Sequence, residues 1–321
     1  MVVIKNYDCV DAGGEYCPCY LAEVGECILC SHLQNKKICE CIWTGQCIYQ
    51  NYIWNQNKRK EQRQNFQAKV LDKKNIMEDI FLLKIKLDKK IVKDLKHPGS
   101  YLMLKDNNSP EYFSAPMSIM DTNEKESCVY TLIEILGSKT KTLSNIEDNI
   151  VVRGPYFNGL IGLKKLKKAK GKKILVVSRG AGIAPAINTI KYLIKNDNKV
   201  TFIVDYGRRK EEFMEEYIEN LDCTIKKMNL KDENHIDILK GMAKEGYDIL
   251  YSSGSDNFSR RMYPIAKENK MAFVILNNSK ICCGEGICGS CTSKDVHGNL
   301  VKLCKTQVKP QEIIERGIPN E

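Results

Sequence analysis

Four cysteines near the C-terminus are spaced C-x4-C-x2-C-x12-C, and this spacing constrains the chain more than any other feature. They are Cys283, Cys288, Cys291 and Cys304. A [2Fe-2S] cluster takes four thiolates, and this spacing offers three from one tight loop and one from a returning strand. The glycines in the loop let it bend and point backbone N–H groups at the cluster sulfurs. A zinc ribbon more usually has two C-x2-C pairs, so the spacing favours a [2Fe-2S] cluster over zinc or structural thiols.

Most of the 15 cysteines lie in two stretches, one near each end of the chain. The N-terminus has no apolar segment typical of a signal peptide, and no stretch approaches the about 20 apolar residues that span a bilayer. We therefore expect a cytoplasmic protein without membrane insertion, in which clustered cysteines bind metal instead of forming disulfides.

The net charge of +10 invites a nucleic-acid interpretation, mainly through the lysine-rich residues 164–173. This run lacks the interleaved aromatic side chains that stack on bases, so we expect no nucleic-acid partner. A basic surface of this kind is better suited to docking an acidic redox partner.

The hydrophobic pattern predicts a multidomain protein. Residues 1–55 are rich in cysteine and poor in apolar runs, so metal would have to hold this module together. Residues 62–160 contain short alternating segments that predict an antiparallel β-barrel. Residues 172–278 alternate buried strands with helices, which predicts a doubly wound α/β domain. Residues 279–321 carry the cluster loop.

A glycine-rich segment, Gly180-Ala-Gly-Ile-Ala-Pro185, follows a predicted buried strand and opens a helix. Such a turn either packs tightly or lets the backbone approach a pyrophosphate at the helix N-terminus. Ser253 and Gly254 end a later strand, at the same carboxyl edge where these folds bind ligands. The candidate NAD(P) residues are Gly180, Ala181, Gly182, Ile183, Ala184, Pro185, Ser253 and Gly254.

A barrel, a nucleotide domain and a terminal C-x4-C-x2-C…C loop, in this order, resemble the electron-transfer subunit of class B dihydroorotate dehydrogenase. That subunit belongs to the ferredoxin–NADP reductase superfamily, and the small subunit of NADH-dependent ferredoxin:NADP oxidoreductase and the flavin subunit of sulfide dehydrogenase look similar. The resemblance covers roughly Phe66 to the end. It implies an FAD-binding barrel, an NAD(P)H-binding domain and a C-terminal [2Fe-2S] domain whose ligands are the four spaced cysteines. Cys282 is left over, and a buried thiol is the better interpretation of it.

The flavin motif of this family, Arg-Pro-(Ile/Leu)-Ser-Ile, falls on Ala115-Pro-Met-Ser-Ile119. The arginine, which would pair with a flavin phosphate, is replaced by Ala115, and Lys105, Lys139 or Arg153 are candidates to supply the charge. A second flavin segment resembles residues 132–140, and residues 154–159 resemble the turn that leaves the barrel. The candidate FAD residues are Pro116, Met117, Ser118, Ile133, Glu134, Ile135, Lys139, Thr140, Asn158 and Gly159.

The sequence leaves the choice between NADH and NADPH open. Arg179 stands where the family usually has glycine, and Ser253-Gly254 resembles the family's Cys-Gly turn near the nicotinamide. Arg208 and Arg209, after a predicted strand, could contact a 2′-phosphate. The resemblance itself leans towards NADH.

Eight N-terminal cysteines do not match any spacing in this family or the ferredoxin run C-x2-C-x2-C-x3-C. They could hold two cubane [4Fe-4S] clusters, one cluster and a zinc ion, or two zinc ions, or they could be metal-free thiols. The candidate ligands are Cys9, Cys17, Cys19, Cys27, Cys30, Cys39, Cys41 and Cys47.

The function expected from these features is that of an electron-transfer flavoprotein subunit. It would pass electrons between NAD(P)H, FAD and a [2Fe-2S] cluster, to or from a catalytic or acceptor oxidoreductase subunit or a ferredoxin. The cofactors carry this chemistry, so no catalytic side chain is assigned. The alternative is a degenerate, flavin-free iron–sulfur scaffold or redox-sensing regulator, which the loss of arginine at Ala115 motivates.

Overall fold

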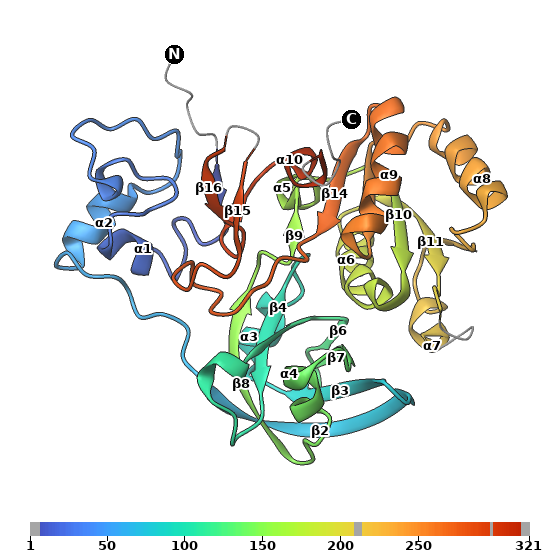
Figure 1. Cartoon of the computed structure of the whole chain (residues 1–321), viewed down its shortest axis with the longest axis horizontal. Helices are drawn as coiled ribbons and strands as arrows, with labels where there is room; N and C mark the ends of the chain where they lie inside the picture. The colour runs from blue at the N-terminus through green and yellow to red at the C-terminus, as the bar shows by residue number, and fades with distance from the viewer. Residues whose placement is uncertain (1–6, 209–213, 296–297, 316–321) are drawn as a thin grey trace.

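The computed structural model describes residues 7–208, 214–295 and 298–315. The N-terminal cysteine-rich module lies at one side of the molecule and joins the rest through an extended segment (Figure 1). A small apolar cluster, which includes Leu29, Leu33 and Ile48 as well as Cys17 and Cys30, forms its interior. Its elements are β1 (Asp8–Cys9), α1 (Tyr20–Glu23), the 3-10 helix η1 (His32–Gln34) and α2 (Ile48–Trp54).

The next region is a seven-stranded antiparallel sheet with the strand order β5-β4-β8-β2-β3-β7-β6. The Thr131 hydroxyl of β7 donates to the Ser118 carbonyl of β5 at 2.9 Å, which links strands near opposite ends of this order. The elements are β2 (Phe66–Met77), β3 (Ile80–Lys86), α3 (Lys89–Asp94), β4 (Tyr101–Lys105), η2 (Glu111–Phe113), β5 (Ala115–Ser118), β6 (Asp121–Asn123), β7 (Cys128–Glu134), α4 (Ser138–Leu143) and β8 (Asn149–Tyr156).

The α/β domain contains a six-stranded sheet with the order β12-β11-β10-β13-β14-β9, parallel except for β9. Successive β10 residues enter different cores: Val176 packs in one cluster with α6, and Val177 in another with α8 and α9. Both faces are therefore covered, as a doubly wound sheet requires. The elements are β9 (Leu160–Ile161), α5 (Leu163–Lys167), β10 (Lys173–Arg179), η3 (Gly180–Gly182), α6 (Ile183–Lys195), β11 (Lys199–Asp205), α7 (Glu215–Ile218), β12 (Thr224–Lys227), α8 (Glu233–Ala243), β13 (Ile249–Ser253), α9 (Asp256–Glu268) and β14 (Ala272–Leu276).

The C-terminal segment lies between the N-terminal module and the α/β domain (Figure 1). After the cysteine loop, β15 (Thr292–Lys294) and β16 (Leu300–Lys302) form an antiparallel hairpin, and α10 (Pro310–Ile314) follows. Between them, β17 (Thr306–Gln307) pairs with β1 at the other end of the chain, with Cys9 opposite Thr306. The described part of the chain contains no helix that combines the length and the apolar character needed to cross a membrane.

Candidate functional site

The C-terminal cysteine loop surrounds the sulfur of Cys283 with hydrogen-bond donors. The backbone N–H of Glu285 donates to this sulfur at 3.3 Å, and the N–H groups of Ile287 and Cys288 also point to it. The contact with Cys304, followed by these N–H groups, lowers the pKa of the Cys283 thiol to about 3. The loop can turn its amides inward because three of its residues have positive φ angles, at Gly284, Gly286 and Gly289.

The four spaced cysteines come together at this loop. Cys304 lies beside both Cys283 and Cys291, and its pKa is raised by these two contacts and by burial. The contact with Cys304 lowers the pKa of Cys291 to about 7. Cys288 is exposed at the surface, whereas Cys291 and Cys304 are buried. Converging thiols that receive backbone N–H groups are the donor set that an iron–sulfur cluster requires, so these residues fit a [2Fe-2S] cluster.

The loop packs directly on the antiparallel sheet. Tyr101 and Met103 of β4 and Tyr156 of β8 form one buried cluster with Cys291 and Cys304. A Cβ at Gly284 would lie 2.6 Å from the Tyr156 ring, so only glycine allows this approach. The sheet and the cysteine site are therefore adjacent. The leftover thiol, Cys282, is half-buried.

As the described side chains are placed, no group of three or more His, Cys, Asp and Glu residues could hold a metal ion. The metal-ligand assignments of the sequence stay predictions.

The segment with the flavin motif forms β5, beside β4. Ala115 is buried in the core of the sheet, whereas Pro116, Met117 and Ser118 are half-exposed. The Lys139 ammonium donates to the Ser114 carbonyl just before this strand, at 3.1 Å. The second flavin segment therefore reaches the first one, through Lys139.

Arg153 lies in the same cross-strand row as Pro116. Met103 of β4 pairs with Pro116 on one side and with Arg153 of β8 on the other. The Arg153 guanidinium contacts Glu111 at 3.1 Å, and its buried Nε atom has no hydrogen-bond partner among the described residues. Lys105 instead donates to the Ser109 carbonyl. A cation with a free donor beside β5 fits a flavin phosphate better than the other two candidates, which already bond to carbonyls.

Several candidate FAD residues have other structural roles. Ile133 is fully buried in the sheet core, and Glu134 and Ile135 are half-exposed. The Thr140 hydroxyl accepts from the Leu136 and Gly137 N–H groups. These positions could meet a ligand mainly through their backbone.

The last two FAD candidates join the C-terminal segment to the sheet. The buried Asn158 amide donates to the carbonyls of Leu303 and Thr306, on either side of Cys304, and accepts from Gln307. Gly159 donates its N–H to Gly99 at 2.8 Å. The Asn158 side chain thus positions the turn between β16 and β17 that carries Cys304, a role that local sequence motifs did not reveal.

The two candidate NAD(P) segments meet at the carboxyl edge of the parallel sheet. The Ser253 hydroxyl donates to the Gly182 carbonyl at 2.6 Å, and a Cβ at Gly182 would collide with the Ser253 carbonyl. Gly180 and Ala181 complete the turn η3, and Ile183, Ala184 and Pro185 begin α6. The turn therefore presents the N-terminal end of a 13-residue helix at this edge, where its dipole favours a negative group.

Next to this turn, Arg179 forms an ion pair with Asp205 at 3.0 Å. The Asp205 carboxylate also accepts the N–H groups of Gly207 and Leu230, so both of its oxygens already accept hydrogen bonds. Arg208 is exposed beyond it, and Arg209 lies outside the described residues. The choice between NADH and NADPH stays open.

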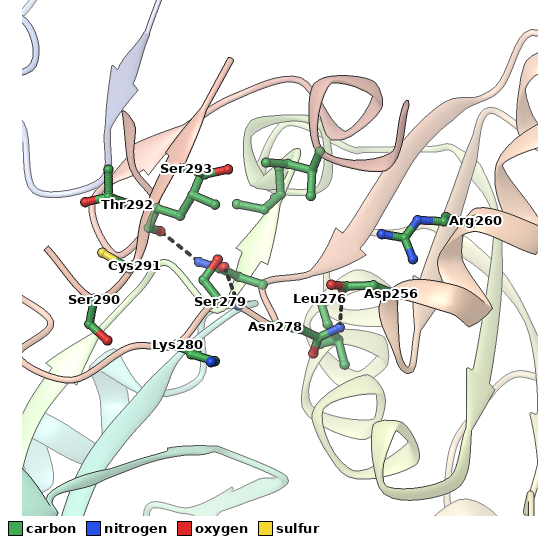
Figure 2. A pocket seen from close by; sticks show the side chains of 14 residues that line it. Asp256, Arg260, Leu276, Asn278, Ser279, Lys280, Ser290, Cys291, Thr292 and Ser293 are labelled. Carbon is green, nitrogen blue, oxygen red and sulfur yellow. Dashed lines mark hydrogen bonds between the residues drawn. The ribbon is translucent and has the colours of Figure 1, made fainter. Parts of the chain in front are cut away.

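A cavity of about 400 Å³ lies between the sheet edge and the cysteine loop (Figure 2). Ser290 and Thr292 flank Cys291 on one side, and Asp256 and Arg260 of α9 lie across from them. The Asn278 amide, between the two sides, donates to Asp256 at 2.9 Å. The start of α9, which follows the Ser253–Gly254 segment, and the cysteine loop therefore line one cavity.

The N-terminal cysteines form two groups. Cys9, Cys17, Cys19 and Cys27 line one small, mainly apolar cavity. The other four, Cys30, Cys39, Cys41 and Cys47, do not line this cavity and are called the outer group. The Cys39 and Cys41 sulfurs lie 3.7 Å apart, Cys30 is buried and Cys47 is exposed.

A buried ion network joins this module to the C-terminal loop, and no sequence motif indicated it. Arg63 contacts Asp11 at 2.8 Å and Glu285 of the cysteine loop at 3.5 Å. Lys305 contacts the same two carboxylates, at 2.8 Å and 3.0 Å. The four charges cancel, which a buried network requires. Although burial opposes its charge, Lys305 and Arg63 hold the pKa of Asp11 well below its usual range.

No family model matches the chain. It is 25% identical over 237 residues to the dihydroorotate dehydrogenase B (NAD(+)) electron transfer subunit of Caldanaerobacter subterraneus subsp. tengcongensis, a match that covers 72% of this chain and 89% of that protein. The probable dihydroorotate dehydrogenase B (NAD(+)) electron transfer subunit of Methanopyrus kandleri is 27% identical, in a match that covers 70% of this chain and 83% of that protein. Electron-transfer subunits of this type are homologues of the chain. The resemblance predicted from the motifs is confirmed.

The fold comparison agrees with the sequence comparison. The solved structure of an NADH-dependent reduced ferredoxin-NADP oxidoreductase, described for flavin-based electron bifurcation, matches with a TM-score of 0.58 at 20% identity, over 74% of this chain and 85% of its own. The crystal structure of full-length CYP116B46 from Tepidiphilus thermophilus matches with a TM-score of 0.53 at 12% identity, over 76% of this chain and 41% of its own. The expected ferredoxin reductase-like fold, with an antiparallel sheet and an α/β domain, is therefore confirmed at this level.

Proposed function

We propose that the chain is an electron-transfer subunit that connects NAD(P)H, FAD and a C-terminal [2Fe-2S] cluster to a partner oxidoreductase subunit or a ferredoxin. The observation that carries the proposal is the position of Cys291 and Cys304. Their thiols pack on Tyr101 and Met103 of β4, the strand beside the flavin motif in β5. A flavin on this sheet would lie next to the cluster ligands. Sequence homology to electron-transfer subunits supports the same assignment.

In this proposal, residues 62–160 are the FAD-binding barrel, 172–278 the NAD(P)-binding domain and 279–321 the [2Fe-2S] domain. When bound, FAD supplies the conversion of a two-electron hydride donor into single electrons, and the cluster supplies a one-electron carrier. The chain's own residues hold and orient these groups. Arg153 supplies the positive charge that Ala115 lacks, while Pro116, Met117 and Ser118 form the half-exposed strand against which the flavin lies.

The turn at Gly180 and Gly182 is assigned to the nucleotide pyrophosphate. Its hydrogen bond with Ser253 holds the two segments against each other, which favours a site that is formed before a ligand binds. The N–H groups that surround Cys283 stabilise its thiolate, and thereby the form that binds iron. Exposed Cys288 places the proposed cluster edge near the surface, where a partner could approach.

The test is the absorption spectrum of the chain after anaerobic purification, before and after addition of NADH or NADPH. We expect flavin and [2Fe-2S] bands that bleach with at least one of the two nucleotides. A flavin-free chain with an intact cluster would instead support the alternative, a scaffold or redox-sensing regulator. Ala115, which removes the usual arginine of the flavin motif, is the observation that favours this alternative.

A further inference from the structure

Four of the eight N-terminal cysteines belong to one site. Cys9, Cys17, Cys19 and Cys27 line the same small cavity, and the other lining side chains are almost all apolar. Cys17 and Cys19 are 7% and 8% exposed, so solvent scarcely reaches them. The four thiols come from separate segments, which the fold brings to the lining of one cavity. Dry, converging thiols are the usual setting of a buried thiolate metal centre.

The sulfurs of this group also receive backbone N–H groups. Cys27 accepts from the N–H of Cys30 at 3.4 Å and also from Leu29. Cys17 accepts from Gly13, and Cys9 accepts from Asp11. N–H donors to sulfur stabilise the thiolate form and tune a bound cluster, and Cys283 has the same type of surroundings in the C-terminal loop.

The site is fixed directly against the C-terminal cysteine loop by three independent contacts. Cys9 pairs with Thr306, two residues after Cys304, across β1 and β17. Leu21 of α1 lines the N-terminal cavity and packs on Gly286 of the loop, where a Cβ would lie 3.0 Å from its Cδ1.

The ion network is the third contact. Asp11, which lines the same cavity, pairs at 2.8 Å with Lys305, the residue after Cys304. Arg63, enclosed between the Tyr16 and Tyr156 rings, joins Asp11 to Glu285 of the loop. The two cysteine groups thus share one buried frame.

We infer that Cys9, Cys17, Cys19 and Cys27 bind an iron–sulfur cluster next to the proposed [2Fe-2S] cluster. Four thiolates are the complete ligand set of either a [2Fe-2S] or a [4Fe-4S] cluster. The site adjoins the proposed [2Fe-2S] cluster through Lys305 and Gly286. Iron is favoured over zinc because an iron–sulfur cluster at this position could exchange electrons with that cluster, whereas zinc could not. This choice of metal rests on the proposed function. The outer group of Cys30, Cys39, Cys41 and Cys47 does not line this cavity and is not part of the proposed ligand set.

The test measures iron, zinc and acid-labile sulfide per chain, with low-temperature EPR after dithionite reduction, on the full chain purified anaerobically. We expect iron well above the about two atoms of one [2Fe-2S] cluster. The double variant Cys17→Ser/Cys19→Ser should fall to about two irons, about a threefold loss if the inner cluster is [4Fe-4S] and twofold if it is [2Fe-2S]. Retained flavin and C-terminal cluster signals would show that this variant is folded.

Two variants serve as controls. Cys223→Ser, which removes a thiol of the α/β domain, and Cys39→Ser, in the outer group, should both keep the inner cluster signal. Zinc in place of the additional iron, or additional iron that survives the double variant, would overturn the inference. Cys283→Ser separates the two proposals, because the inner iron should remain when the C-terminal cluster is lost.

Discussion

The two cysteine-rich regions of the molecule present thiols in different ways. In the C-terminal loop, three cysteines lie within nine consecutive residues and one sulfur collects N–H groups from its own loop. In the N-terminal module, four thiols come from segments spread over residues 9–27 and meet at a cavity formed by tertiary packing. A local loop reveals its chemistry through spacing alone. A site assembled by packing reveals its members only in the structure.

The strongest test of this comparison removes one ligand from the C-terminal loop. Cys291→Ser should eliminate the C-terminal cluster and lower NADH-dependent reduction of a one-electron acceptor by more than about 100-fold. Reduction of the flavin by NADH should persist, because the nucleotide and flavin segments are untouched. Stopped-flow absorbance measures both steps. Unchanged one-electron transfer would show that the loop is not the exit for electrons.

A second change weakens the buried ion network that joins the two cysteine-rich regions. Arg63→Met leaves two buried carboxylates, Asp11 and Glu285, with Lys305 as their one shared cation, which should cost about 3–5 kcal/mol of unfolding free energy. Denaturant unfolding of the anaerobic protein measures the loss. Arg63→Lys, which keeps the charge but not the bidentate contact, should lose less. Equal stability of all three proteins would contradict a joined frame.

The same network predicts that the stability of the folded chain falls at acid pH. Because the folded pKa of Asp11 is lowered, its contribution to stability is complete above its ordinary pKa, about 3.9, and is lost as the pH falls through the lower folded value. We expect unfolding midpoints of the wild type to fall steeply below about pH 4. In Arg63→Met the fall should be shallower, because part of the shift is gone. Parallel curves would rule out this role for the network.

The next prediction concerns FAD binding and the cation that we assign to it. Arg153→Ala removes the cation beside β5 and should weaken FAD binding by about 10–100-fold, equivalent to one charged hydrogen bond. Arg153→Lys should retain part of the affinity, and Lys105→Ala, whose ammonium is already bonded to Ser109, should change it little. Flavin fluorescence on dilution measures the dissociation constant. Equal losses in Arg153→Ala and Lys105→Ala would refute the assignment.

The smallest expected effect concerns the direct contact between the two regions. Gly286 has a φ of +79°, and a Cβ there would press on Leu21. Gly286→Ala should therefore cost more than the about 1–2 kcal/mol that a positive φ alone costs an alanine. Gly298→Ala, also at a positive φ but with open space around it, is the matched control and isolates the backbone cost. An equal loss in both variants would mean that the Leu21 contact carries no strain.

Much of the fold could be predicted from the sequence where its causes are local. The apolar run of β10 and the glycine turn after it identified the parallel sheet, and the cysteine spacing identified the loop. The remainder depends on residues far apart in the chain. Asp11 and Lys305 are 294 positions apart, and no local pattern predicts that they pair. For the same reason, the motif that predicts a flavin turn at Asn158 does not reveal that its amide bonds to the turn around Cys304.

The central claim is that electrons pass from a nicotinamide nucleotide through this chain to the C-terminal cluster. An anaerobic NADH titration followed by low-temperature EPR tests it most directly. We predict that a [2Fe-2S] signal grows with added NADH and that Cys291→Ser abolishes it. A signal that appears with dithionite, but with neither NADH nor NADPH, would contradict the account.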